Sequence, residues 1–373
     1  MAPGASANKL QLGVFAANLD GGLTATTAPE RQSLSWPNCV EIATRADRAG
    51  FEMQVPLARW KPLGGATHFN GVNYESLTWA AGVSAVTQSS SVFATVHVPV
   101  IHPIVAAKQM TTIDHISGGR FGLNLVCGWF PAEFAMFGSP MMSHDDRYAY
   151  AGEWLELVRR LWTAEEEFDF EGRFFKVEKG WHQPKPLHKP YPPVMQAGSS
   201  GTGARFAAKY ADIAFKSINE AEPMEEAAAR FADLRRLGRE DYGRSFEIWT
   251  GAWVICRPTE REAQQFLEHC LADHGDFAIL DTLPPDVLPP AGSVPAEELK
   301  RLRYKALGGW GGAHLVGTPD QIVERLQAFS DAGADGVVLS WVDYVDGLDN
   351  WNREVMPLLE QAGLRRPFAA EAG

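Results

Sequence analysis

The sequence lacks several patterns that would each indicate a familiar class of protein. It has only four cysteines in 373 residues, far apart and in no CxxC or disulfide-framework spacing, which suits a reducing compartment. No run approaches the ~20 apolar residues of a membrane span. The start, MAPGASANK, has no apolar core of signal-peptide length. These absences predict a cytoplasmic protein that does not span a membrane.

Positive charge is also scarce. The chain carries 34 Lys and Arg against 46 Asp and Glu, a formal net charge of −12. Nucleic acids and anionic membranes both attract basic surfaces, so this balance argues against either as a partner. The remaining expectation is a small-molecule ligand.

Three common catalytic signatures are missing as well. The histidines show no HxH or HExxH spacing, which gives a metal site no support. No GxSxG elbow is present, so the common type of serine hydrolase is unsupported. No GxGxxG follows the first strand-like segment, which weakens a dinucleotide-binding interpretation.

The chain does contain a long series of alternating strand-like and helix-like segments. Apolar runs at 10–19, 51–57 and 91–98 are each followed by a segment with helical spacing. Nearly continuous apolar strands indicate a parallel sheet covered on both faces. The length of the series favours an α/β fold of the (β/α)₈ TIM-barrel type with insertions, in one domain over residues 1–373. An open doubly wound sheet stays possible, because the sequence does not show the strand order.

Two segments interrupt the series. Residues 168–177 alternate in polarity around a Glu-Gly pair, which suggests an inserted hairpin. Residues 273–312 are rich in proline and end in the run GGWGG at 308–312. This longer segment is either a surface excursion or a mobile lid that is hinged on the glycines and closes over the barrel mouth.

Polar residues occur late in the strand-like segments, and the carboxyl ends of barrel strands carry the active site. Thr95 and His97 end SVFATVHV, Asn124 interrupts FGLNLV, and Ser199 and Ser200 follow VMQAG. A buried asparagine is most simply satisfied by neighbouring backbone. Its amide also offers a donor and an acceptor to the edge of a heteroaromatic ligand.

Two helix starts are candidates for an anion site. The turn GSSGTG at 198–203 is either a simple helix cap or, facing a ligand, a seat for phosphate. Arg147 and Tyr148 stand at another helix start. Arg147 either pairs with the neighbouring Asp145 or Asp146, or completes a phosphate clamp.

Several longer segments, in this order and spacing, resemble the bacterial-luciferase-like flavin-dependent monooxygenases, and in particular the subgroup of pyrimidine and dimethyl-sulfone monooxygenases. They are AAKQMTTIDHISGGRFGLNLVCGWFPAEF, SHDDRYAYAGEWLELVRRLW, FEGRFF, QPKPLHKPYPPVMQAGSS and LVGTPDQIVERL. The resemblance runs from about residue 10 to residue 364.

This resemblance implies a two-component enzyme. A separate NAD(P)H-dependent flavin reductase would supply reduced FMN (FMNH₂), and O₂ would react to give a flavin (hydro)peroxide. The expected reaction cleaves a carbon–heteroatom bond in a small organic substrate, namely a sulfone, a sulfonate or an amide heterocycle. Relatives also suggest a homo-oligomer, either a dimer or a tetramer.

The same resemblance assigns site residues. The implied flavin contacts are Ala58, Arg59, Thr95, Asn124, Glu133, Arg147, Tyr148, Ser199 and Ser200. The implied catalytic side chains, which form an oxygen pocket beside the flavin, are Val55, Thr95 and Asn124. The residues expected to contact the substrate are Trp60, His97 and Trp129. At 58–59 this chain departs from the Ile-Lys of the pyrimidine monooxygenases.

Two other functions fit the same barrel. One is a dehydrogenase that uses the deazaflavin F420 and consumes no oxygen. The other is a non-catalytic flavin-binding relative, against which the retention of Asn124, Arg147, Tyr148 and Ser200 argues.

Overall fold

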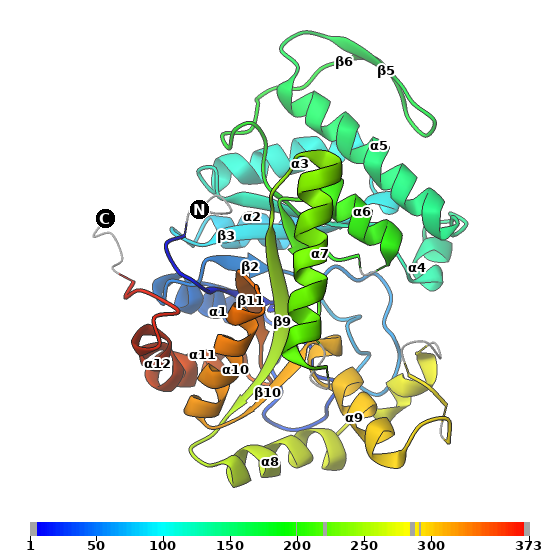
Figure 1. Ribbon diagram of the computed structural model, residues 1–373. Helices are drawn as coiled ribbons and strands as arrows, with labels where there is room; N and C mark the ends of the chain where they lie inside the picture. The colour runs from blue at the N-terminus through cyan, green and yellow to red at the C-terminus, as the bar shows by residue number, and fades with distance from the viewer. Residues whose placement is uncertain (1–5, 199, 219–221, 284–287, 291, 369–373) are drawn as a thin grey trace.

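The computed structural model describes residues 6–198, 200–218, 222–283, 288–290 and 292–368. Its main sheet is a ring of parallel strands in the order β1, β2, β3, β4, β7, β8, β9, β11 (Figure 1). The strand bounds are β1 Gln11–Phe15, β2 Met53–Val55, β3 Ser91–His97, β4 Phe121–Val126, β7 Val194–Gln196, β8 Ile213–Phe215, β9 Glu247–Cys256 and β11 Gly336–Ser340.

Two pairings close the ring and decide between the two predicted sheet types. β11 pairs with β1, and β8 pairs with the first residues of β9. The later part of β9 instead pairs with β10, Ala313–Gly317. The open doubly wound alternative is therefore wrong, and the prediction of a (β/α)₈ barrel is confirmed.

Helices surround the ring on its outer side and at its carboxyl end. They are α1 Trp36–Arg48, α2 Ser76–Ser84, α3 Pro103–Ile116, α4 Pro131–Met136, α5 His144–Thr163, α6 Gly201–Tyr210, α7 Met224–Tyr242, α8 Glu260–Glu268, α9 Ala296–Leu307, α10 Pro319–Asp331, α11 Tyr344–Asn350 and α12 Met356–Gln361. The largest apolar cluster lies between these helices and the strands. The predicted hairpin is also present: β5, Phe168–Glu171, pairs antiparallel with β6, Lys176–Gly180, and extends beyond α5 in Figure 1.

A separate apolar cluster fills the inside of the ring. Met53, Phe93, Met195, Ile213 and Trp249 pack there, each from a different strand. Their side chains alternate along the strands with those that face the helices. The barrel interior is therefore a packed floor, and any ligand has to bind above it, at the carboxyl ends of the strands.

The described residues of the proline-rich segment 273–312 pack over this carboxyl end. It contains a short helix, Phe277–Thr282, and α9, and both contribute to an apolar cluster that also includes Trp253 of β9. Gly309 has φ +77, and a Cβ there would lie 2.5 Å from the Cβ of Trp253. The glycines thus allow backbone to lie directly on an indole. Movement of this segment as a lid stays a prediction.

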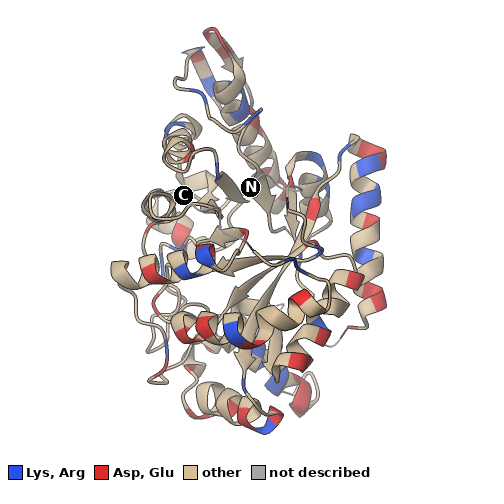
Figure 2. Cartoon of the chain, turned by 90° about the vertical axis from the view of Figure 1, so that its left-hand side faces the viewer, with Lys and Arg blue, Asp and Glu red and all other residues tan. Residues whose placement is uncertain are grey.

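Charged side chains lie mainly on the outer helices. Figure 2 shows acidic and basic residues interspersed there, with few on the central strands. Among the residues that the structure describes, no helix is both long and apolar enough to cross a membrane.

Candidate functional site

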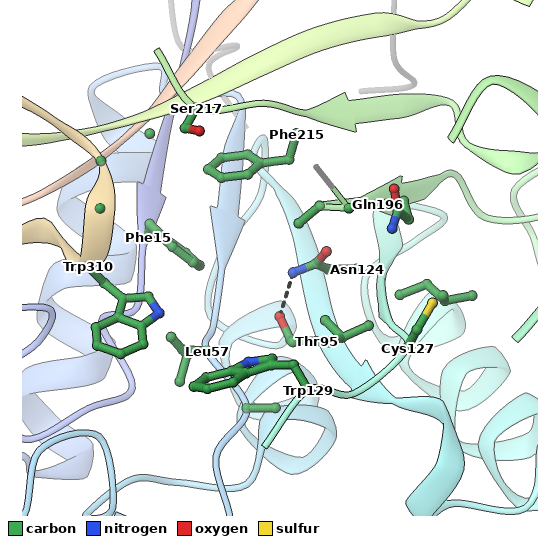
Figure 3. Close-up of a pocket in the computed structure, with 18 of the residues that line it drawn as sticks. Phe15, Leu57, Thr95, Asn124, Cys127, Trp129, Gln196, Phe215, Ser217 and Trp310 are labelled. Atoms are coloured by element: carbon green, nitrogen blue, oxygen red, sulfur yellow. Dashed lines mark hydrogen bonds between the residues drawn. The ribbon is translucent and has the colours of Figure 1, made fainter. Parts of the chain in front are cut away.

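A pocket of about 680 Å³ lies at the carboxyl ends of the strands. We call it the barrel pocket. Loops after β1, β2, β4, β7 and β8 line it, together with residues 309–312. Figure 3 shows Phe15 and Trp310 on one side of the space, Asn124 and Gln196 on the opposite side, and Trp129 below. Its volume is in the range of sites that enclose a small organic ligand or cofactor.

Asn124 presents a free acceptor to this pocket. β3 and β4 pair so that Thr95 and Asn124 are register partners, and the Asn124 Nδ2 donates to Thr95 Oγ1 at 2.9 Å. Thr95 Oγ1 in turn donates to the backbone oxygen of Pro56. Asn124 Oδ1 is buried and has no hydrogen-bond partner among the described residues. Since a buried polar atom without a partner is costly, this oxygen suits a ligand that donates a hydrogen bond.

Gln196, at the end of β7, provides a second such acceptor. Its side chain lines the barrel pocket, and its Oε1 is buried without a partner within the described chain. Two residues on neighbouring strands thus line one cavity, and each has a buried amide oxygen without a partner among the described residues.

The other walls of the barrel pocket are apolar or aromatic. The rings of Trp129 and Trp310 lie 6.2 Å apart at 32°, and the Phe15 and Phe215 rings are 6.1 Å apart. Trp310 has φ +48, in the left-handed region that a non-glycine residue seldom adopts. Cys127 lines the pocket too, and burial raises the pKa of its thiol to about 12. A thiol with so high a pKa is neutral at ordinary pH, so Cys127 serves as an apolar lining residue and not as a nucleophile.

The predicted anion seat forms where α5 and α6 begin. Tyr148 hydrogen-bonds with Ser200 and Gln196, and burial raises the pKa of its hydroxyl. Ser200 caps α6 by accepting from the Gly203 backbone N–H at 3.0 Å. A Cβ at Gly198 would lie 2.5 Å from the Tyr148 hydroxyl, so the turn has no room for a side chain.

Arg147 is available to a ligand, because the structure does not pair it with its acidic neighbours. Asp145 contacts His144 and Thr202, and Asp146 pairs with Arg173 at 2.9 Å. The Arg147 Nη1 donates to a backbone oxygen, and its Nε is buried without a partner among the described residues. The clamp alternative is therefore the one that the geometry favours.

Lys216 adds a cation that sequence reasoning missed. It follows β8, lines the barrel pocket, and its Nζ donates to the backbone oxygen of Gly198. Burial lowers its pKa to about 8. Its position directly after an apolar strand could have indicated Lys216 from the sequence, as a late position in a strand did for Thr95 and Asn124. The other pocket residues that were missed are Phe15, Gln196, Phe215 and Trp310.

Glu133, in contrast, is the centre of a buried, internally paired cluster. Its carboxylate accepts from the backbone N–H of Trp60 at 2.8 Å, and it lies 3.4 Å from Arg59 Nη1 and 3.2 Å from His97 Nδ1. Burial alone would raise the pKa of this carboxyl, but the hydrogen bond from His97 and the charge of Arg59 hold the pKa below its usual value. The Arg59 guanidinium also lies over the Trp129 ring, 4.9 Å from its centroid.

A second pocket, of about 470 Å³, lies on the outer side of this cluster. We call it the rim pocket. It shares Ala58, Arg59, Thr95 and His97 with the barrel pocket. Trp60, Asn73, Leu77, Val96, Ile101, Gln109 and Phe137 are among its other lining residues.

Most of the predicted site residues meet in these two pockets. The barrel pocket is lined by Ala58, Arg59, Thr95, His97, Asn124, Trp129, Arg147, Tyr148 and Ser200. Trp60 lines only the rim pocket, and Glu133 lines neither because it lies behind Arg59. Val55 belongs to the interior cluster, not to the lining side chains. Ser199 lies outside the described residues.

The barrel pocket fits the expected flavin. Its aromatic and apolar walls suit a flat ring system, and the unpartnered oxygen of Asn124 suits an N–H group on a ring edge. Arg147, Ser200 and Lys216 lie together where a phosphate tail would need cations and hydroxyls. No group of three or more His, Cys, Asp or Glu residues in the described chain is placed to hold a metal ion.

Fold and site together define a parallel α/β barrel with a pocket at the carboxyl ends of its strands that suits an aromatic ligand with an anionic tail. Within that class, the chain belongs to the luciferase-like monooxygenase family, whose model matches residues 10–336.

Three comparisons place the chain among known proteins. It is 29% identical over 357 residues to the FMNH₂-dependent dimethylsulfone monooxygenase of Pseudomonas putida, covering 94% of this chain and 96% of that protein. It is 30% identical over 371 residues to the pyrimidine monooxygenase of a Bradyrhizobium strain, covering 95% and 99%. The solved EDTA monooxygenase of Chelativorans superposes with a TM-score of 0.80, covering 97% and 96%; at 24% identity this likeness concerns the fold alone.

Proposed function

We propose that this protein is a two-component monooxygenase. It uses reduced FMN, supplied by a separate NAD(P)H-dependent flavin reductase, and O₂ to cleave a carbon–heteroatom bond in a small organic substrate. Membership of the luciferase-like monooxygenase family supports the reaction type. The FMNH₂ dependence named for the Pseudomonas putida relative supports the cofactor.

One observation carries the proposal. The barrel pocket combines two unpartnered amide oxygens, at Asn124 and Gln196, with an unpartnered guanidinium nitrogen at Arg147. The Asn124 acceptor and the Arg147 cation, with Gln196 beside Tyr148 and Ser200 at the anion seat, match a heterocycle that bears ring N–H groups and a phosphate. A neutral apolar ligand would leave all three atoms unsatisfied.

The bound flavin supplies the electrons that activate O₂. The chain supplies position and a dry environment. Arg147, Lys216 and the start of α6 would hold the anionic tail, and the Asn124 oxygen would orient the ring edge. The indoles of Trp129 and Trp310 exclude water from the space above the barrel floor.

Asn124 and Thr95 form the polar part of an otherwise apolar wall. The Thr95 hydroxyl donates to Pro56 and accepts from Asn124, so the orientation of the Asn124 amide is set by protein contacts. A fixed amide dipole stabilises charge that develops beside it without first having to reorganise.

Substrates that follow from the relatives are sulfones and amide heterocycles, with sulfonates as a third group. The test is an oxygen-uptake screen of these compounds with purified protein, FMN, NADH and a flavin reductase. We expect substrate-dependent product that carries one oxygen atom from ¹⁸O₂. The matched control is Arg147→Ala, which should lose turnover at low FMN concentration and recover it at high concentration.

Two results would contradict the proposal. One is failure of the wild-type protein to bind FMN or FMNH₂. The other is reduction or oxidation of F420 with an alcohol or sugar phosphate and no oxygen uptake, which would identify a dehydrogenase instead.

A further inference from the structure

The rim pocket is a ligand-sized space beside the barrel pocket, and the two share four lining residues. Gln109, on the exposed face of α3, marks its outer side. Trp60 and Phe137 border it as well and are 40% and 39% exposed. At its inner end it reaches Arg59 and His97, which also line the barrel pocket. A molecule in the rim pocket would therefore lie next to one in the barrel pocket, at the residues that the two pockets share.

The inner end offers hydrogen bonds that the protein does not use. Arg59 Nε is buried without a partner in the described part of the chain. His97 Nδ1 faces the Glu133 carboxylate at 3.2 Å. Because a carboxylate only accepts, Nδ1 carries the proton, and Nε2 is the nitrogen left for a ligand.

The charge at this inner end is already balanced. Arg59 is paired with Glu133, and both side chains are at most 3% exposed. An anionic ligand would meet the carboxylate as well as the guanidinium, and would gain little net attraction. An uncharged group that accepts hydrogen bonds is not repelled by the Glu133 carboxylate and can still accept from Arg59.

The outer walls are apolar. Leu77, Val96 and Ile101 line one part, and Trp60 and Phe137 meet edge to face with ring centroids 5.3 Å apart. Such walls select ligands by apolar shape, while a few polar groups fix the orientation.

We propose that the rim pocket is the substrate compartment, and that it takes an uncharged sulfonyl or amide-carbonyl compound. The oxygen of the substrate accepts from Arg59 Nε, and in an amide compound the neighbouring N–H donates to His97 Nε2. The apolar part of the substrate lies against Leu77 and Phe137. Glu133 acts as a positioning residue, because it sets the orientation of both His97 and Arg59. This inference rests on the proposed function, since the barrel pocket must hold the flavin.

The first test places small molecules directly. Crystals of the FMN-loaded protein are soaked with dimethylsulfone, uracil or methanesulfonate. We expect density in the rim pocket for at least one of the two uncharged compounds, with its oxygens facing Arg59, and none there for methanesulfonate. Density only in the barrel pocket, density for methanesulfonate alone, or none for any of the three would overturn the proposal.

The second test fills the pocket without touching the flavin site. Val100→Phe and Gln109→Trp each add bulk to residues that line the rim pocket and not the barrel pocket. With a substrate from the oxygen-uptake screen, we expect KM to rise at least tenfold while the Kd for FMN stays at the wild-type value. Ile116→Trp, on an exposed position of the same helix, is the matched control and should leave both constants unchanged.

A third variant tests the positioning role of Glu133. Glu133→Gln keeps an acceptor for Trp60 but no longer enforces a proton on His97 Nδ1, so the pH profile of kcat should change shape. Unchanged KM in both filled variants, or a wild-type pH profile in Glu133→Gln, would overturn the assignment. Failure of FMN binding or of oxygen uptake in the wild-type protein would instead contradict the proposed function, so the two failures are distinguishable.

Discussion

On the side of the barrel mouth formed by the ends of β2 and β3 and by α4, the charged groups are paired with one another. Glu133 contacts Arg59, His97 and the backbone of Trp60. On the side formed by the starts of α5 and α6 and the end of β8, Arg147 and Lys216 donate to backbone oxygens and form no ion pair with a carboxylate among the described residues.

The difference indicates two different uses of charge. A buried pair is costly to break, and it fixes the loops that carry it. A buried cation without a carboxylate partner has an unfavourable desolvation free energy. A bound anion offsets this cost, so such cations favour anion binding. The first side is therefore expected to govern stability and loop position, and the second to govern affinity for the cofactor phosphate.

Glu133→Ala should give the largest effect, because it breaks the paired side. It leaves the buried Arg59 guanidinium and the Trp60 N–H without their acceptor. Removing one partner of a buried ion pair typically costs about 3–5 kcal/mol. Urea unfolding followed by tryptophan fluorescence measures the loss, and Glu133→Gln, which keeps the acceptor, should lose less. An Ala variant as stable as wild type would contradict this view of the cluster.

Asn124→Leu removes the amide that lies between the two sides. We expect kcat with saturating FMNH₂ to fall about 100-fold, the scale seen when one preorganised polar group beside developing charge is lost. Stopped-flow turnover with a substrate from the screen measures it. Thr95→Val, which removes the hydroxyl that orients the amide, should give a smaller fall in the same direction. A fall in stability without a fall in kcat would make Asn124 a packing residue.

Arg147→Ala tests the unpaired side. Hydrogen bonds to charged groups contribute about 1.5–3 kcal/mol, so the Kd for FMN should rise between about 10- and 100-fold. The urea midpoint should stay near wild type, because no ion pair is broken. Equilibrium quenching of flavin fluorescence gives the Kd. Arg353→Ala, at a side chain that is 66% exposed, is the control and should change neither quantity.

Lys216 gives the smallest effect, a pH dependence. Its pKa is lowered by burial to about 8, so its positive charge is present below that pH and absent above it. The affinity for FMN should therefore fall a few-fold as pH rises through about 8, and Lys216→Met should abolish this step. Since the unfolded chain binds more protons between pH 8 and the ordinary lysine pKa of about 10.4, stability itself should rise with pH in that window. A pH-independent Kd in the wild type would place Lys216 away from the phosphate.

The comparison also shows which parts of the site the sequence could reveal. Thr95, Asn124 and Ser200 were recognisable because each is a polar residue late in an apolar strand or directly after one, and this signal is local. Arg147 carried a signal too, but the choice between surface pair and clamp needed the positions of Asp146 and Arg173. Gln196 and Lys216 also stand at strand ends, but sequence analysis missed them because no recognisable motif lies beside them.

The sequence by itself determined the alternation of strands and helices, the hairpin at β5 and β6, and the polar residues at the strand ends. Apolar periodicity, turn residues and helix caps act over a few residues, so they are legible along the chain. Only the tertiary structure decided that β8 pairs with β9 to close the ring and that Trp310 reaches the pocket over Trp129. It also decided that Arg59 and His97 both contact the buried carboxylate of Glu133. These contacts join residues far apart in the chain, and their free energy depends on burial that exists only once the barrel has formed.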